Sequence, residues 1–167
     1  IVLLDLDLGM NDWSSKEFEW DDAKEYDRGK VLSKEDLDEI EEFGRYLDVD
    51  GDGVPYRTYP GTHPQKGAYF TRGTSHDEYA RYTEDGVKNA EVLSRLTKKF
   101  QTASSTVPKP VFNQEESTSS IGVIYFGSTD CSMQEALDVL EDNNIDVDAM
   151  RIRSFPFNLE VWEFIED

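Results

Sequence analysis

The stretch IGVIYFGSTDCSMQEALDVLEDNNIDVDAMRI, residues 121–152, decides the fold of the C-terminal part of this chain. Its first six residues form an apolar, β-branched run that predicts a buried strand, and residues 145–152 predict a second strand. Between them, Met133, Leu137 and Leu140 recur at the spacing of one helix face. A strand, a helix and a second strand in this order predict one right-handed, parallel βαβ unit, and hence an α/β fold.

The loop after the first strand, Gly127-Ser-Thr-Asp-Cys131, leads into the start of the helix, where α/β sheets commonly bind ligands. Amide groups at a helix start attract anions, but Asp130 would oppose a phosphate. The glycine spacing is not that of a dinucleotide-binding or P-loop motif. Cys131 is either a reactive thiol at this helix start or ordinary packing, and the sequence leaves both open.

The sequences at both ends of the chain indicate domains that continue beyond it. Residues 1–8 begin with Ile-Val-Leu-Leu, which predicts a strand buried on both faces, and residues 159–165 predict an amphipathic helix without a stop signal. Two strands are too few for a stable parallel sheet. We therefore expect a fragment of a longer polypeptide, in which the βαβ unit is incomplete.

An irregular loop-and-helix segment is expected before the βαβ unit. Ser33 is a candidate N-cap for a helix over residues 34–47, and the apolar spacing predicts a second helix over residues 87–100. Prolines and glycines in residues 48–85 predict a long loop between them. In chain order, the sequence predicts the end strand of a preceding domain in residues 1–12, a linking segment in 13–107, a linker in 108–120, and the start of the last domain in 121–167.

The composition indicates a globular, strongly acidic protein. Among 167 residues, 36 acidic and 17 basic side chains give a net charge of −19, which disfavours nucleic acid and anionic membranes as partners. No apolar run approaches the roughly 20 residues of a membrane-spanning helix. The single cysteine, Cys131, excludes an internal disulfide, and a cytoplasmic location fits best.

A candidate metal site lies in Asp48-Val-Asp50-Gly-Asp52-Gly53, which matches the first half of an EF-hand loop. Three carboxylates at alternate positions can converge on Ca²⁺ or Mg²⁺. The final position of such a loop, where an EF-hand needs a bidentate glutamate, is occupied by Tyr59. The alternative is an Asx-turn in which aspartate and glycine serve only the backbone geometry.

A second candidate site is a basic and aromatic loop whose candidate residues are Arg57, His63, Lys66, Arg72 and His76, with Arg81 as a further cation. Such a concentration of cations could recognise a carboxylate or a phosphate. The alternative is that these groups pair with acidic neighbours in the sequence, namely Asp77, Glu78, Glu84 and Asp85. The two histidines do not have the spacing of a zinc motif.

A series of motifs in a fixed order resembles one family, the alpha subunit of 2-oxoacid:ferredoxin oxidoreductases. The series covers nearly the whole chain, and no single motif is as diagnostic as the order. The motifs are Asp5-Leu-Asp-Leu-Gly-Met-Asn11, Tyr26-Asp-Arg-Gly-Lys30, Asp50-Gly-Asp-Gly-Val-Pro-Tyr-Arg57, Pro60-Gly-Thr-His-Pro64, Arg72-Gly73 with His76-Asp77-Glu78, Ile121-Gly-Val-Ile-Tyr-Phe-Gly-Ser128, and Arg151-Ile-Arg-Ser-Phe-Pro-Phe157.

The resemblance implies a thiamine-diphosphate enzyme that oxidatively decarboxylates a 2-oxoacid with coenzyme A and passes electrons through iron–sulfur clusters to ferredoxin. It implies that residues 121–167 begin a transketolase-C-like domain, that a beta subunit is a partner, and that the assembly is oligomeric. Thiamine diphosphate, magnesium and the clusters would be bound mainly by the beta subunit or other parts. No catalytic residue carries over to this chain, and the motifs are most similar to the 2-oxoglutarate type.

The resemblance also suggests a place for the basic loop, from Arg57 to Arg81, at a subunit interface near the substrate. Two other functions stay open. The chain could be a divalent-cation-binding module that uses Asp48, Asp50 and Asp52, or a purely structural interaction domain.

Overall fold

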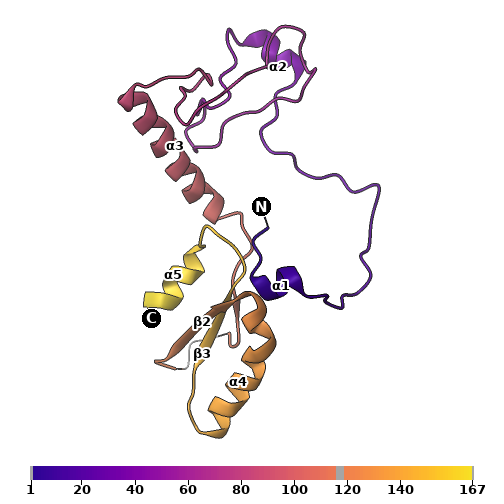
Figure 1. Cartoon of the computed structure of the whole chain (residues 1–167), viewed down its shortest axis with the longest axis vertical. Helices are drawn as coiled ribbons and strands as arrows, with labels where there is room; N and C mark the ends of the chain where they lie inside the picture. Colours follow the sequence, from indigo (N-terminus) through magenta and orange to yellow (C-terminus); the bar gives the residue numbers. More distant parts are fainter. Residues whose placement is uncertain (1, 116–118, 167) are drawn as a thin grey trace. The chain divides into compact units, whose positions relative to one another are not determined.

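The computed structural model describes residues 2–115 and 119–166 of the chain, which form two compact units. The described residues of Ile1–Trp20 and Ser104–Asp167 make up one unit, here called the sheet unit. Asp21–Ala103 make up the other, here called the loop unit. Figure 1 colours both units along the sequence.

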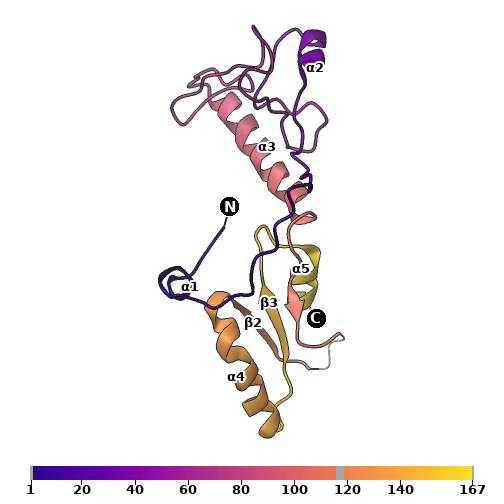
Figure 2. The same cartoon turned by 90° about the vertical axis from the view of Figure 1, so that its right-hand side faces the viewer.

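The sheet unit contains the predicted parallel βαβ arrangement. Strand β2 (Gly122–Phe126) continues through a short 3-10 turn, η1 (Gly127–Thr129), into helix α4 (Asp130–Asp142), and the chain returns as strand β3 (Asp148–Ile152). Strands β2 and β3 pair in parallel from Gly122↔Asp148 to Phe126↔Ile152. Helix α5 (Leu159–Glu166) follows, and α4 and α5 lie on opposite sides of the strands in both views (Figures 1 and 2). The mixed α/β fold class is therefore confirmed.

A third strand lies within the predicted linker of residues 108–120, which is a correction. Strand β1 (Val111–Phe112) pairs antiparallel with β3, so β3 is central in the order β1-β3-β2. Asn113 extends this pairing, because its backbone N–H donates to the Ala149 carbonyl and its side-chain oxygen accepts from the Ala149 N–H at 2.7 Å. A two-residue strand is too short to show an alternating pattern, so the sequence did not reveal it. Residues 116–118 of the linker lie outside the described residues.

The core of the sheet unit is built around β3. Its buried hydrophobic residues include Val147, Ala149, Met150 and Val161. Gly122 lies against the Phe164 ring of α5, where a Cβ atom would come within 3.1 Å of the ring. The predicted amphipathic C-terminal helix is confirmed as α5, which contributes Val161 to this core.

The strand predicted over residues 1–8 is wrong for the described residues 2–8. Helix α1 (Leu6–Met10) forms instead, and the Asp5 carboxylate caps it by accepting the Leu8 N–H at 2.8 Å. Val2, Leu3 and Leu4 are exposed and not part of a strand. An aspartate that caps the first turn gives the local backbone a hydrogen-bonded alternative to a strand, and apolar content alone did not predict this outcome.

In the loop unit, helix α2 (Lys34–Glu39) begins as predicted, with Ser33 and Asp36 in a capping box. It ends at Glu39 rather than at residue 47, because Ile40 has an extended backbone and the Lys66 ammonium binds the last carbonyls of the helix. Helix α3 (Gly86–Ser104) confirms the second predicted helix and extends beyond it. Between Glu39 and Gly86, all of it described, the chain forms no helix.

None of the helices in the described residues is both long enough and apolar enough to cross a membrane.

The predicted domain assignments of residues 1–12, 13–107 and 121–167 stay predictions.

Candidate functional site

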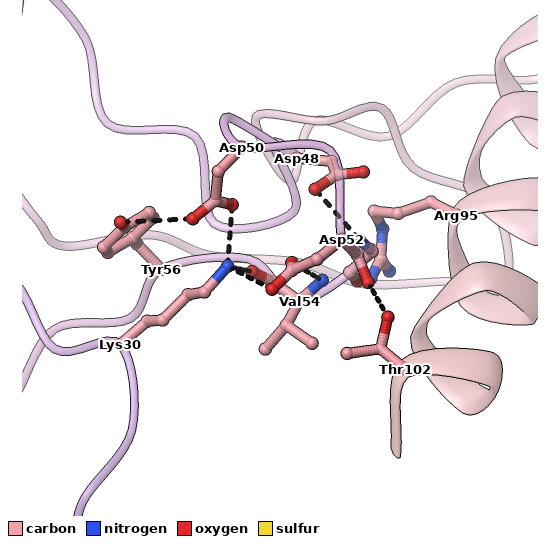
Figure 3. Close-up of polar contacts among 9 residues, drawn as sticks. Lys30, Asp48, Asp50, Asp52, Val54, Tyr56, Arg95 and Thr102 are labelled. Atoms are coloured by element: carbon pink, nitrogen blue, oxygen red, sulfur yellow. Dashed lines mark hydrogen bonds and ion pairs between the residues drawn. The ribbon is translucent and has the colours of Figure 1, made fainter. Parts of the chain in front are cut away.

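The three aspartates of the candidate metal site lie together at the start of the long loop. One carboxylate oxygen from each of Asp48, Asp50 and Asp52 lies within 4.8 Å of the others. Helix α3 holds this loop from one side: Thr102 Oγ1 donates to the Asp52 carbonyl at 2.5 Å, and Arg95 Nη1 donates to the Gly53 carbonyl at 3.0 Å (Figure 3). The group is therefore assembled on a helix of the loop unit. We call residues 48–53 the aspartate loop.

A lysine from an earlier segment provides a positive charge to the aspartate loop. Lys30 Nζ lies 2.6 Å from Asp50 Oδ1, 2.7 Å from Asp52 Oδ2 and 3.1 Å from the Val54 carbonyl oxygen (Figure 3). The ammonium group thus occupies three oxygen ligands that a hard cation would otherwise use. Its single positive charge is shared between two of the three carboxylates, those of Asp50 and Asp52.

The contact between Lys30 and the two aspartates shifts the pKa values of all three side chains. The hydrogen bond from Lys30 lowers the pKa of the Asp50 carboxyl and of the Asp52 carboxyl from the ordinary value of 3.8. Burial lowers the pKa of the Lys30 ammonium, but hydrogen bonds to Asp50 and Asp52 outweigh that effect and raise it above 10.5. The carboxylates therefore lose this stabilisation only as pH falls through their lowered folded-state pKa values. The ammonium loses it only as pH rises through its raised value.

The backbone of the aspartate loop is fixed by aspartate side chains. Asp48 Oδ1 accepts the Gly53 N–H at 3.0 Å, and Asp52 Oδ1 accepts the Val54 N–H at 2.8 Å. Gly51 and Gly53 have φ angles of +74° and +80°, in the left-handed region that glycine adopts readily. Asp48 and Asp52 therefore do serve the backbone geometry of this loop. Cation binding by the three carboxylates stays a prediction.

Replacing Lys30 by methionine tests whether the ammonium competes with a metal ion. We expect the unchanged chain to bind Ca²⁺ more weakly than about 10⁻³ M, the weak limit of natural EF-hand sites. In Lys30→Met, the same carboxylates lose their internal cation, so Ca²⁺ affinity should rise by about tenfold or more. Calorimetric titration of the full chain measures both values.

Lys34→Met is the matched control. Lys34 is exposed on α2, and its substitution removes the same charge from the same unit. It should leave Ca²⁺ affinity unchanged. Saturable Ca²⁺ binding by the unchanged chain that Asp50→Asn abolishes would contradict the competition.

The basic loop does not bring its predicted residues to one point. Arg57 Nη2 donates to the Arg28 carbonyl at 2.6 Å. His63 Nε2 lies 3.0 Å from Asp38 Oδ1, and Lys66 Nζ donates to backbone carbonyls at the end of α2. These three side chains therefore hold the loop unit together.

The other two predicted residues differ from these. His76 stacks on the Tyr46 ring with 4.0 Å between centroids, and its Nδ1 lies 3.0 Å from the Asp77 carbonyl oxygen. Arg72 is exposed and forms no hydrogen bond or ion pair within the described part of the chain. Arg72 is thus the member of the set that is open to a partner.

The predicted pairing of the five basic residues with Asp77, Glu78, Glu84 and Asp85 is wrong in its partners. The carboxylate that meets His63 is Asp38, and Arg57 and Lys66 bind backbone carbonyls instead. Nearness of charged residues along the sequence did not identify these contacts, because the loop folds back onto α2 and onto residues 28–32.

Two arginines near Tyr46 were not predicted. The guanidinium carbons of Arg45 and Arg95 lie 5.4 and 5.8 Å from the centroid of the Tyr46 ring. Burial lowers the pKa of the Arg95 guanidinium, with a further contribution from the Arg45 charge. In the sequence, Arg95 lies next to Leu96 on the apolar side of the predicted helix, and this position could have indicated that its side chain is partly buried. Lys30 belongs to one of the sequence motifs, but the sequence did not predict it as a partner of the aspartates.

Comparison with known proteins identifies a relative of this chain. Over 134 residues, which make up 78% of the chain, the sequence is 30% identical to 2-oxoacid:ferredoxin oxidoreductase 2, subunit alpha, from Aeropyrum pernix. This chain is a homologue of that alpha subunit. The resemblance drawn from the motif series is therefore confirmed. No family model matches the chain.

A solved structure has a similar fold. It is the 2-oxoglutarate:ferredoxin oxidoreductase from Magnetococcus marinus, with a TM-score of 0.61 and 20% sequence identity over 75% of this chain. The alignment covers 19% of the A. pernix subunit and 22% of the M. marinus chain, so this chain spans about a fifth of either. The likeness supports the mixed α/β fold, and the transketolase-C-like assignment stays a prediction.

Proposed function

We propose that this chain is a segment of the alpha subunit of a cytoplasmic 2-oxoacid:ferredoxin oxidoreductase. The complex would decarboxylate a 2-oxoacid oxidatively, transfer the acyl group to coenzyme A and reduce ferredoxin. The observation that carries this proposal is the 30% identity over 134 residues to a curated alpha subunit. The likeness of fold to a second oxidoreductase of this kind supports it.

We propose that 2-oxoglutarate is the substrate. The M. marinus enzyme, whose fold resembles this one, was solved with 2-oxoglutarate, coenzyme A and succinyl-CoA bound. The motif series in the sequence favours the same type. Pyruvate is the alternative that the assay below distinguishes.

The cofactors of the proposed reaction would be held elsewhere in the complex. An iron–sulfur cluster needs about four thiolate ligands, and this sequence contains one cysteine, so the cluster does not fit this chain. Thiamine diphosphate would supply the decarboxylation chemistry. We assign no catalytic residue to this chain, and we place the binding of thiamine diphosphate and magnesium mainly in the beta subunit.

The role that we propose for this segment is packing and subunit assembly. In the sheet unit, Phe126 and Ile124 are 64% and 44% exposed, although both belong to a strand of the sheet. Strand β2 also has β3 as its single neighbour in the described sheet. An apolar strand face beside an unpaired edge favours association with further parts of the subunit or with the beta subunit.

The experiment that tests the function uses the complete alpha subunit assembled with its beta subunit. Reduction of a viologen dye is measured with coenzyme A and 2-oxoglutarate, then with pyruvate, each with and without thiamine diphosphate. Reduction that depends on thiamine diphosphate with 2-oxoglutarate would support the proposal, and preference for pyruvate would correct the substrate. No reduction with any 2-oxoacid by a properly assembled complex would contradict the proposed activity.

Within this proposal, Arg72 is the residue of the basic loop that we expect to matter for activity. Because it is exposed and has no partner within the described residues, its charge is available to a partner subunit or an anionic ligand. Arg72→Ala should lower kcat/KM of the assembled enzyme by about tenfold, the cost of losing one charge-assisted hydrogen bond.

The control for Arg72→Ala is Lys34→Ala, which removes an exposed cation from α2 in the same unit. Analytical ultracentrifugation of both variants separates a loss of assembly from a loss of turnover. Unchanged kinetics and unchanged assembly for Arg72→Ala would place the basic loop away from substrate and interface.

A further inference from the structure

The loop between β2 and α4 already holds an anion, the carboxylate of Asp5. Asp5 Oδ2 accepts the Ser128 N–H at 2.6 Å, across 123 positions of sequence. Its other oxygen, Oδ1, accepts the Leu8 N–H at 2.8 Å and caps α1. One carboxylate therefore joins the N-terminal segment to the βαβ unit, and α1 lies beside the start of α4 in both views (Figures 1 and 2).

The shape of the loop fits the same carboxylate oxygen. Gly127 has a φ angle of +60°, and a Cβ atom at this position would lie 2.1 Å from Asp5 Oδ2. That separation is far shorter than any stable non-bonded contact between carbon and oxygen. The carboxylate oxygen therefore occupies space that only a glycine leaves open at this position.

The charges around the loop also suit an anion. The loop leads directly into helix α4, which has thirteen residues, and the start of a helix carries partial positive charge. Asp130, which the sequence suggested would oppose an anion here, forms an ion pair with Arg151. Its negative charge is therefore offset by a cation. A second carboxylate oxygen, Asp7 Oδ2, accepts from Ser128 Oγ at 3.5 Å.

We propose that the Gly127–Ser128 loop is a carboxylate-binding site, and that its ligand is Asp5 of the same chain. Asp5 thereby latches the segment before Trp20 onto the end of β2. This position, at the carboxyl end of a parallel strand, is one where α/β sheets commonly bind external ligands. Here the chain fills it with its own side chain.

The protonation of Asp5 agrees with the latch. Hydrogen bonds from the backbone of Leu8, and then of Ser128, lower the pKa of the Asp5 carboxyl from 3.8. The ionised carboxylate that the loop binds is consequently the form present near neutral pH.

The decisive variant is Asp5→Asn in the full chain. Asparagine is as good an N-cap as aspartate, so its one carbonyl oxygen can keep capping α1, while its amide nitrogen cannot accept the Ser128 N–H. We expect amide hydrogen exchange to become about tenfold faster or more at Ser128 and across residues 6–11, with exchange in β2 and β3 unchanged. The matched control is Asp12→Asn, which removes an exposed carboxylate of the same segment and should change none of these rates.

Gly127→Ala provides a second route to the same state, because its Cβ would displace the carboxylate without altering Asp5. It should speed exchange in residues 6–11 as Asp5→Asn does. Slow exchange at Ser128 retained in Asp5→Asn would overturn the proposal. If Gly127→Ala instead unfolds the sheet unit, Asp5→Asn still decides, because it removes no atom from β2 or α4.

A rescue experiment identifies the chemistry of the site. In Asp5→Ala the side chain is removed, and sodium acetate can supply a free carboxylate. Acetate should restore slow exchange at Ser128 but not in residues 6–11, because the free ion cannot tether the segment. Sodium chloride at equal ionic strength is the control. If chloride restores Ser128 equally, the loop responds to ionic strength and carboxylate recognition is overturned.

Discussion

Gly53→Ala should detach the aspartate loop from helix α3 and destabilise the loop unit by more than about 4 kcal/mol, a loss that few single substitutions reach. A Cβ atom at Gly53 would lie 2.4 Å from Lys99 N, 2.8 Å from the Arg95 carbonyl oxygen and 2.9 Å from the Lys98 carbonyl carbon. All three are backbone atoms of a helix, so none can rotate away. The expected result is loss of the contact that supports the three aspartates, seen as lower stability in urea and faster exchange in residues 48–54.

The matched control for Gly53→Ala is Gly61→Ala. The φ angles are nearly equal, +80° at Gly53 and +83° at Gly61, but a Cβ atom at Gly61 would have no atom within 4 Å. Gly61→Ala should therefore cost only the left-handed backbone strain of about 1–2 kcal/mol. Equal losses for the two variants would show that backbone strain, rather than contact with α3, explains the effect.

Met150→Ala should destabilise the sheet unit by about 2–5 kcal/mol, the range for removing a long buried side chain. Met150 is 0% exposed and lies in the central strand β3, where it pairs with Phe112 of β1 and Ile124 of β2. Truncation leaves a cavity between both neighbours, because a small sheet has few side chains that can move to fill it. Hydrogen exchange in β2 and β3 of the full chain, with and without urea, measures the loss.

Met10→Ala serves as the control for this variant. Met10 is the same residue type in the same unit, but it is 76% exposed, so the substitution should stay within about 0.5 kcal/mol. A loss below about 1 kcal/mol for Met150→Ala would mean that the sheet unit does not depend on burial around β3.

The aspartate loop shows that carboxylates at the spacing of a calcium-binding loop can instead bind a lysine of the same chain. Its sequence matches half of a calcium-binding loop, and the three carboxylates do converge. The structure adds Lys30, which supplies a positive charge to Asp50 and Asp52 from within the chain. An acidic motif at cation-binding spacing therefore does not by itself establish a metal site, because a lysine can offset the same charges.

The sequence by itself determined the features that depend on near neighbours. Ser33 and Asp36 are three positions apart, and their mutual hydrogen bonds fixed the start of α2 without any distant residue. The apolar periods of α3, α4 and α5, and the β-branched run of β2, likewise specified their own secondary structure. The order of the motifs also indicated the alpha-subunit homologue, because the order of segments is a property of the chain alone.

Only the tertiary structure decided which distant groups meet. Lys30 reaches Asp50 and Asp52, Lys66 ends α2, and Asp5 binds Ser128 across 123 positions of sequence. Hydrogen bonds are short and directional, so a partner is selected by its position in space, and local periodicity carries no information about that position. For the same reason the two residues of β1 became a strand only because β3 presented an edge to them. Val2, Leu3 and Leu4 joined no strand, and Leu6–Met10 formed a helix capped by Asp5.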